Sequence, residues 1–387
     1  DTSSTSLQYL DDKYCQKKFP SSYDREWKCP INYNDNEENL NGYSTDLPLD
    51  KVDVDITTLT NIVSPDDANI CLIVTRRQSN GKLYHRYYCN GEDSRNTPYE
   101  TWSSSKIFAM ANAAGKSHSE CSTSGLQSSV TGKHGKTALG DLSTIIASYD
   151  HTMGYSSNSL SSYFHDLGWR TRINDLVTGS WLNQPTNSLG GNYGEASPSD
   201  LGLTLTSTDG STCKLEKESP PVFPNSLSML SASELTRRIA LYRDLDSTYT
   251  FPDSTWDDMK EILYGANEHS TLFPGVQWGG MTSCTSIFVQ SAINISQVEV
   301  DSLGKWRIFT KLGAGYSSSR GRGEIMNNAY ACLPKLDEFG NPIPNSGFEF
   351  TLSVRGSVVG DTSLKKAEEK VHTAVVNTIQ ALLNGKL

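Results

Sequence analysis

The strand-forming segments of this 387-residue chain lie in two regions that are far apart in the sequence. The first region is a hairpin at 68–91, where Asn80-Gly81 favours a tight turn between two apolar runs. The second region lies after residue 280 and contains three segments typical of strands: 284–289, 306–311 and 348–355. Neither region alone has enough strands for a stable sheet, so the hairpin and the late strands should meet in one sheet.

Helices are predicted between these regions and at the end of the chain. The segment that starts at Ser103 continues as Lys106-Ile-Phe-Ala-Met-Ala, which is strong helix sequence, and Gly115 supplies a stop. The last helix covers 364–383, where apolar residues recur at helical intervals. We therefore expect an α+β fold: an antiparallel sheet built from the N-terminal hairpin and the C-terminal strands, flanked by helices, with an inserted, mostly α-helical lobe.

This order of elements divides the chain into three parts. Residues 1–50 are polar and lack clear periodicity, and residues 1–65 are interpreted as an irregular N-terminal extension. Residues 66–115 and 275–387 form an α/β lobe, and residues 116–274 form the mainly helical lobe. No apolar run is long enough to span a membrane, and we expect no transmembrane segment.

The eight cysteines indicate an oxidising compartment. None is in a CxxC pair, which disfavours zinc, and we expect no metal site. Folding the hairpin at Asn80-Gly81 brings Cys71 and Cys89 nearly opposite each other, within reach of a disulfide. A bridge between Cys15 and Cys29 would close a short loop in the extension. The alternative is eight buried free thiols in a cytosolic protein; we favour a secreted or periplasmic one.

Charge and motifs exclude several classes of function. A net charge of −10 and a pI near 5.2 argue against nucleic acid or an anionic membrane as a partner. The sequence contains no GxSxG elbow, no HExxH motif and no convincing phosphate-binding loop. No cofactor is therefore expected.

A serine followed three residues later by a lysine occurs five times, so this spacing alone decides nothing. Only Ser103 stands at the start of a strong apolar helix, which places Lys106 on the same face. A helix amino terminus lends partial positive charge where an oxyanion would develop, and a desolvated lysine can take the serine proton. The alternative is a helix-capping serine beside a solvated lysine.

Two further motifs follow in the order that such a site requires. Ser156-Ser157-Asn158 begins a predicted helix, and Lys311-Leu312-Gly313-Ala314 ends an apolar strand. With Ser103-Ser104-Ser105-Lys106, they make residues 66–387 resemble the superfamily of serine β-lactamases, penicillin-binding proteins and DD-peptidases, whose signatures are S-x-x-K, S-x-N and K-T/S-G. The resemblance implies a β-lactamase-like fold and a serine acyl-transfer enzyme.

The resemblance also implies roles for the matching residues. Ser103 would attack the substrate carbonyl, and Lys106 would be the general base for acylation. Ser156 would relay a proton to the leaving group, while Asn158 would position Lys106 or the substrate amide. Lys311 would keep the site electropositive and hold Ser156 in place.

The oxyanion would be bound by backbone groups at the start of the helix that carries Ser103 and at the end of the strand that carries Lys311. The backbone N–H groups of Ser103 and Ala314 would donate to it, with Gly313 beside them in the substrate site. Each such donor is typically worth about 10²–10³ in rate.

Two departures from the family pattern concern substrate and turnover. Leu312 replaces the hydroxyl residue that helps to grip a substrate carboxylate, so we expect Arg320 or Arg322 to take over that contact, unless both are ordinary loop charges. Gly179 stands where class A β-lactamases have the glutamate that drives deacylation, so efficient deacylation by that route is not supported.

These observations predict an exported serine hydrolase that acts on a small-molecule or peptide ester or amide through an acyl-enzyme. The Leu312 departure favours a carboxypeptidase or esterase over a β-lactamase. The alternatives are a catalytically inactive binding or scaffold protein on the same fold and a glutaminase-like amidase.

Overall fold

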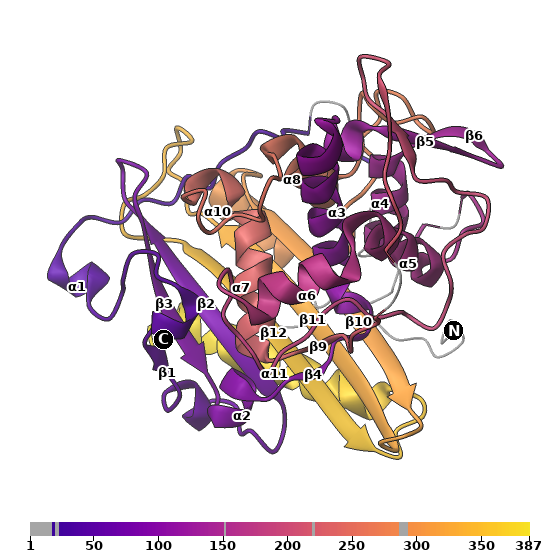
Figure 1. The fold of residues 1–387 in the computed structure, drawn as a ribbon. Helices are drawn as coiled ribbons and strands as arrows, with labels where there is room; N and C mark the ends of the chain where they lie inside the picture. Colours follow the sequence, from indigo (N-terminus) through magenta and orange to yellow (C-terminus); the bar gives the residue numbers. More distant parts are fainter. Residues whose placement is uncertain (1–17, 20–22, 151, 219–220, 286–292) are drawn as a thin grey trace.

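The computed structural model describes residues 18–19, 23–150, 152–218, 221–285 and 293–387. Its centre is a six-stranded sheet with strand order β1-β3-β2-β12-β11-β10 (Figure 1). The strands are β1 (Val54–Asp55), β2 (Asn69–Arg77), β3 (Leu83–Cys89), β10 (Arg307–Ser317), β11 (Arg322–Leu333) and β12 (Phe348–Val359). Strand β12 pairs antiparallel with β2, which puts Phe350 opposite Val74. The early hairpin therefore joins the late strands in one sheet, as the sequence predicts.

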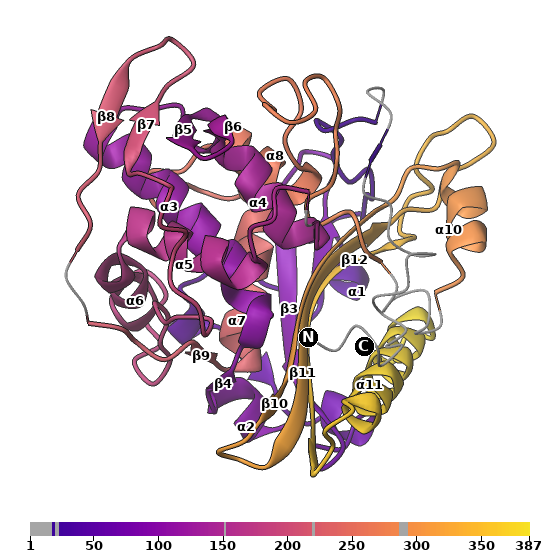
Figure 2. The ribbon, with the colours of Figure 1, turned by 90° about the vertical axis from the view of Figure 1, so that its right-hand side faces the viewer.

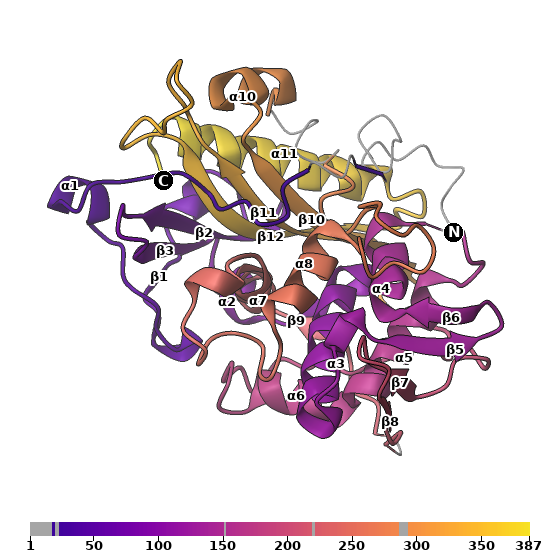
Figure 3. The ribbon, with the colours of Figure 1, turned by 90° about the horizontal axis from the view of Figure 1, so that it is seen from above.

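Helices cover both faces of this sheet. Figures 2 and 3 show α11 (Lys365–Leu383) on one face and the helical part of the chain on the other. Because side chains alternate along a strand, β10 sends Ile308 and Leu312 into the core beneath α11 and Phe309 into the core on the opposite side. The expected α+β class, with helices flanking the sheet, is confirmed.

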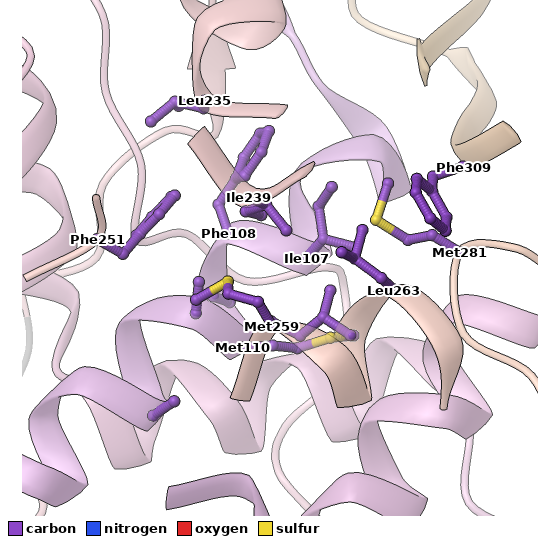
Figure 4. Packing of buried hydrophobic residues seen from close by; sticks show 14 of the residues in the cluster. Ile107, Phe108, Met110, Leu235, Ile239, Phe251, Met259, Leu263, Met281 and Phe309 are labelled. Atoms are coloured by element: carbon purple, nitrogen blue, oxygen red, sulfur yellow. The ribbon is translucent and has the colours of Figure 1, made fainter. Parts of the chain in front are cut away.

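The helical part packs around α3 (Lys106–Cys121). Figure 4 shows Ile107, Phe108 and Met110 of α3 among apolar side chains from neighbouring elements, including Ile239 and Met259. The surrounding helices are α4 (Leu139–Ser148), α5 (Ser157–Gly168), α6 (Arg170–Thr178), α7 (Met229–Ala240) and α8 (Trp256–Tyr264). A helix that is apolar on most of its faces must lie inside the protein, and α3 is buried along Lys106–Ser117.

Shorter elements complete the described chain. The helices are α1 (Glu37–Leu40), α2 (Glu92–Asn96) and α10 (Ile295–Ser302). The strands are β4 (Tyr99–Glu100), β5 (Ser129–Gly132), β6 (Gly135–Ala138), β7 (Thr204–Thr206), β8 (Thr212–Lys214) and β9 (Ser226–Leu227). Most of the strand expected at 284–289 lies outside the described residues. Within the described ranges, no helix has the length and apolar character needed to cross a bilayer.

Disulfides tie distant parts of the chain together. Cys71 and Cys89 are direct cross-strand partners and are bonded, with Cα atoms 4.1 Å apart, as predicted. Cys29 is bonded to Cys332 of β11, so the expected bridge from Cys29 to Cys15 is wrong. The short-loop argument failed because the segment after Cys29 packs against the central sheet, where the Tyr33 N–H donates to the Arg77 carbonyl and the Tyr33 hydroxyl donates to the Gly347 carbonyl. Cys15 itself lies outside the described residues.

Candidate active site

Ser103 lies in a 3₁₀ turn (Trp102–Ser105) that leads directly into α3. The sequence predicted that the helix would start at Ser103; the first three residues form this tighter turn instead. The turn begins with a strained residue, because Trp102 has a φ of 51°, a left-handed conformation that L-residues avoid. Asn328 of β11 holds the turn in place by donating to the Ser104 carbonyl at 3.0 Å.

The turn presents Ser103 to a cleft of about 1260 Å³. Asn158 and Ala314 also line this cleft, which brings together residues from all three sequence motifs. Segments 191–194 and 222–226 both border the cleft, whereas Gly179 follows α6 and is not part of the lining.

Lys106 is buried, with 1% of its surface exposed. Its Nζ donates to Ser157 Oγ at 2.9 Å and to Asn158 Oδ1 at 2.7 Å. Burial lowers the pKa of Lys106 to about 7, while the charge of the Glu195 carboxylate acts in the opposite direction. About half of the amines with a pKa near 7 are neutral, and able to act as a base, at pH 7.

The structure places the two serines of the second motif differently from the sequence prediction. Ser156 is the N-cap of α5, where it accepts from the Ser159 N–H at 3.0 Å, and its hydroxyl also donates to Glu195. Ser157 is therefore the hydroxyl that contacts Lys106. Among these described residues, no hydrogen bond joins Lys106 to Ser103 or to Ser156. Capping of α5 engages the first serine of the motif and leaves the second one facing the lysine.

Strand β10 packs directly against the turn that carries Ser103. A Cβ atom added at Gly313 would lie 2.6 Å from the Ser103 backbone nitrogen and 2.7 Å from that of Ser104. Only glycine allows this approach, since real Cβ atoms do not come so close to backbone atoms. The sequence selected Gly313 for the substrate site, and the structure gives it a steric role.

Within the described part of the chain, β10 is the last strand of the sheet, and its outer edge offers a backbone donor beside Ser103. The N–H groups of Thr310 and Leu312 both point out of the sheet, to the Met281 carbonyl at 2.8 Å and to the Tyr149 hydroxyl at 3.3 Å. Because alternate residues of an edge strand point the same way, the Ala314 N–H also points outward, into the cleft that it lines. The Ser103 N–H is in the first turn of a helix, where N–H groups lack intrahelical acceptors. The two donors border one cleft.

Lys311 is in a different environment from the expected one. It is buried, and its Nζ donates to the Leu312 carbonyl at 2.8 Å and to the Tyr149 hydroxyl at 3.1 Å rather than to Ser156. Burial, together with the nearby charge of Lys106, lowers the pKa of Lys311 well below its ordinary value. Through these two hydrogen bonds, Lys311 connects β10 to Tyr149 at the end of α4.

Leu312 points away from the cleft. It lies in the core beneath α11, on the opposite face of β10 from Lys311 and Gly313. From the sequence, we expected the side chain at position 312 to contact the substrate. In this structure, strand alternation removes any side chain at 312 from that surface.

The two arginines proposed for carboxylate binding are already engaged. Arg320 lines the cleft, and its guanidinium is paired with both Glu100 and Glu324. Arg322 donates from Nε to Ser357 Oγ of β12 at 2.7 Å. A substrate carboxylate would have to displace one of these partners.

Residues missed by the sequence analysis include Ser157, Glu195 and Glu100. Ser157 was the middle residue of a recognised motif, so only its orientation was missing. Glu195 follows Gly190-Gly191-Asn192-Tyr193-Gly194, a glycine-rich loop that could have been identified as a cleft border. No local pattern marks Glu100, because its importance depends on Arg320, far away in the sequence.

No model of a protein family matches this chain, and neither does any curated protein. Solved structures similar to it include a β-lactamase from Burkholderia vietnamiensis, at 11% identity and a TM-score of 0.44, covering 85% of this chain and 96% of the other. A class A β-lactamase from Mycobacterium abscessus is 12% identical, with a TM-score of 0.41 and coverages of 84% and 98%. A protein named PBP-A is 12% identical, with a TM-score of 0.44 and coverages of 88% and 99%. These are similarities of fold, and we draw the function of the site from its own geometry.

Proposed function

We propose that this chain is a serine hydrolase that cleaves an ester or an amide through an acyl-enzyme on Ser103. One observation carries the proposal: Lys106, with a pKa of about 7, is buried one helical turn after a serine that opens onto a large cleft. Burying an amine is costly, and a structural lysine would keep its charge in water. Strongly shifted groups in a cleft are typical of catalytic sites.

The residues support a complete acylation step. Ser103 Oγ would form a bond to the substrate carbonyl carbon while its proton passes to the neutral amine of Lys106, directly or through Ser157. The backbone N–H groups of Ser103 and Ala314 would stabilise the oxyanion. The bond between the acyl carbon and the leaving oxygen or nitrogen would then break, and the proton held by Lys106 would pass to that leaving atom through Ser157 or, as the family resemblance implies, Ser156. Water would finally hydrolyse the acyl-enzyme.

The direct test is covalent labelling. A fluorophosphonate and a fluorescent penicillin, each followed by intact mass and peptide mapping, should distinguish an enzyme from an inactive binding protein on the same fold. We expect one fluorophosphonate adduct on Ser103. Absence of any adduct with both probes, under conditions that label a control serine hydrolase, would contradict the proposal. Turnover of glutamine that depends on Ser103 would instead identify an amidase.

Acylation should depend on the protonation of Lys106. Only the neutral amine accepts a proton, so we expect the rate of acylation to rise with pH and to level off above a midpoint near 7. Stopped-flow measurement of acylation by a p-nitrophenyl ester, over a range of pH in which the protein stays folded, provides the midpoint. A rate that shows no midpoint in this range would remove Lys106 as the base.

The charge of Glu195 should affect the pH midpoint of acylation. Its carboxylate raises the pKa of Lys106 against the effect of burial, so the Glu195→Gln variant should move the midpoint to lower pH. The matched control is Glu120→Gln, which removes an exposed carboxylate paired with Lys116. A midpoint that moves upward, or that moves equally in both variants, would contradict the assignment.

The close approach of β10 to the Ser103 turn predicts a large effect of a single methyl group. In Gly313→Ala, the Cβ atom would collide with the backbone nitrogens of Ser103 and Ser104 and separate the two oxyanion donors. We expect kcat/KM for acylation to fall by about 10²-fold, the effect of losing one such donor. The control is Gly202→Ala, where an added Cβ meets nothing within 4 Å. Equal acylation rates in the two variants would argue against an oxyanion site between β10 and Ser103.

We further propose that the protein is exported. Three disulfides join cysteines in the described part of the chain, and such bonds persist in oxidising compartments. Loss of folding when the protein is made in a reducing cytosol, with recovery in an oxidising one, would support this proposal.

A further inference from the structure

We propose that the cleft selects acyl donors that carry no carboxylate, because its cationic side chains are already paired with protein carboxylates. The inference rests on the acyl-enzyme proposed at Ser103 and names the class of substrate for it: neutral esters or amides with an apolar or aromatic part.

The charged residues that line the described cleft balance one another: two carboxylates, Glu100 and Glu324, face two guanidinium groups, Arg320 and Arg355. Arg320 is paired with both carboxylates. Arg355 donates to Glu324 at 2.7 Å and lies over the Tyr99 ring, with its guanidinium carbon 3.9 Å from the centroid. A carboxylate entering this region meets no net positive charge from the lining.

The lysines near the site do not supply the missing cation. Lys311 is buried against Tyr149 and the Leu312 carbonyl, and burial favours its neutral form. Lys106 donates to Ser157 and Asn158, and the proposed chemistry requires it neutral. Leu312, in the position where the family carries a hydroxyl, points into the core beneath α11.

The walls of the cleft fit an apolar substrate better than a charged one. The lining contains several aromatic and aliphatic side chains from different elements: Tyr99, Trp102, Tyr193, Val222, Phe223 and Tyr316. Two of these remain open to solvent, with 49% of Val222 and 39% of Tyr316 exposed. An apolar acyl chain or ring would cover this surface and gain hydrophobic free energy.

Glu100 controls the selection. Glu324 is 3% exposed, and pulling Arg320 away from it would leave a buried carboxylate with one partner fewer. Glu100 is 40% exposed and can be removed at little cost to the fold. In Glu100→Gln, two guanidinium groups would share one carboxylate, and Arg320 could bind a substrate carboxylate in a charge-assisted pair.

The experiment compares matched p-nitrophenyl esters. One series consists of half-esters of dicarboxylic acids from succinate to suberate, which place a carboxylate at increasing distance from the reacting carbonyl. The other series consists of fatty-acyl esters of the same chain lengths. The kcat/KM values for acylation are measured for the wild type, Glu100→Gln, the double variant Glu100→Gln/Arg320→Gln, and Glu120→Gln as a control away from the cleft.

The wild type should prefer the neutral ester of each pair by about tenfold or more. Glu100→Gln should raise the ratio of kcat/KM for at least one half-ester to that for the matched neutral ester by about tenfold. The gain should disappear in the double variant, and Glu120→Gln should match the wild type.

Two kinds of failure are distinguishable. If neither series forms an adduct on Ser103, the proposed function itself is wrong. If the wild type is acylated but prefers half-esters, or if Glu100→Gln leaves the ratio of the two series unchanged, the substrate class is wrong and the acyl-enzyme proposal stands.

Discussion

Replacing Ser103 by alanine should abolish covalent labelling and reduce kcat for ester hydrolysis by about 10⁴-fold or more, as loss of a nucleophile does in other serine enzymes. The alanine cannot form the bond to the acyl carbon, whereas the cleft, Lys106 and the β10 donors remain. Intact mass after incubation with a fluorophosphonate measures the loss, and steady-state hydrolysis of a p-nitrophenyl ester measures its size. Unfolding by heat should show a stability close to that of the wild type, since Ser103 is only partly buried.

Two serines serve as matched controls. Ser104 is adjacent to Ser103, but its hydroxyl donates to the Thr101 carbonyl at 2.6 Å and is fully buried. Ser211 begins another serine–lysine spacing, Ser211…Lys214, and lies on an exposed turn with its hydroxyl donating to Asp209. Ser104→Ala and Ser211→Ala should keep the adduct. An adduct that persists in Ser103→Ala, or that maps to another residue in the wild type, would contradict the assignment of the nucleophile.

Replacing Lys106 by methionine should slow acylation by about 10³-fold, within the range for loss of a general base. Methionine fills a similar volume but accepts no proton. Lys106→Arg should be equally slow, because a guanidinium does not deprotonate in this pH range. The control is Lys116→Met, on the same helix, where the amine lies 4.2 Å from the centroid of the Trp169 ring and away from the cleft. An unchanged acylation rate in Lys106→Met would exclude the lysine from the mechanism.

The same variant should change the dependence of stability on pH. The pKa of Lys106 is about 7 in the folded protein and about 10.5 when the side chain is exposed in the unfolded chain. Between these values the unfolded state binds a proton that the folded state has released, so this group makes the free energy of unfolding rise with pH. Below pH 7 both states are protonated and the full cost of burying the charge remains.

Lys106→Met lacks this cost. It should therefore be more stable than the wild type below pH 7, and its advantage should shrink as the pH approaches 10. Urea unfolding of both proteins at the two ends of this range measures the difference. A difference in stability that does not vary with pH would mean that Lys106 is not desolvated, and would remove the physical basis for its role as a base.

The broad architecture could be read from local patterns. The Asn80-Gly81 turn specifies the hairpin, and the hairpin puts Cys71 opposite Cys89, because the residues involved are close along the chain. The apolar run after Lys106 specifies a helix buried on most of its faces. The need to complete a sheet then brings the hairpin to the late strands.

The details of the site could not be read in this way. Whether Ser156 or Ser157 faces Lys106 depends on which residue caps α5, and this one-residue choice rotates the hydroxyls by a large angle around the helix. The direction of Leu312 depends on the register of β10 in the sheet, which is set by its pairing with β11. A sequence motif specifies residue types and their spacing, and it does not specify which residue caps a helix or which face of a strand a side chain occupies.

Strand β11 (Arg322–Leu333), which lies between β10 and β12, was not predicted from the sequence. The sequence by itself determined the early hairpin, the helix after Lys106, the last helix and one disulfide, and it led us to select Ser103 and Lys106 among five similar spacings. These follow from periodicity, turn chemistry and helix propensity, which act over a few residues. Only the tertiary structure decided the lowered pKa of Lys106 and the pairing of the charged residues that line the cleft. Burial of Lys106 and the pairing of Arg320 with Glu100 join segments that are distant in the chain, and desolvation and ion pairing depend on distances in space.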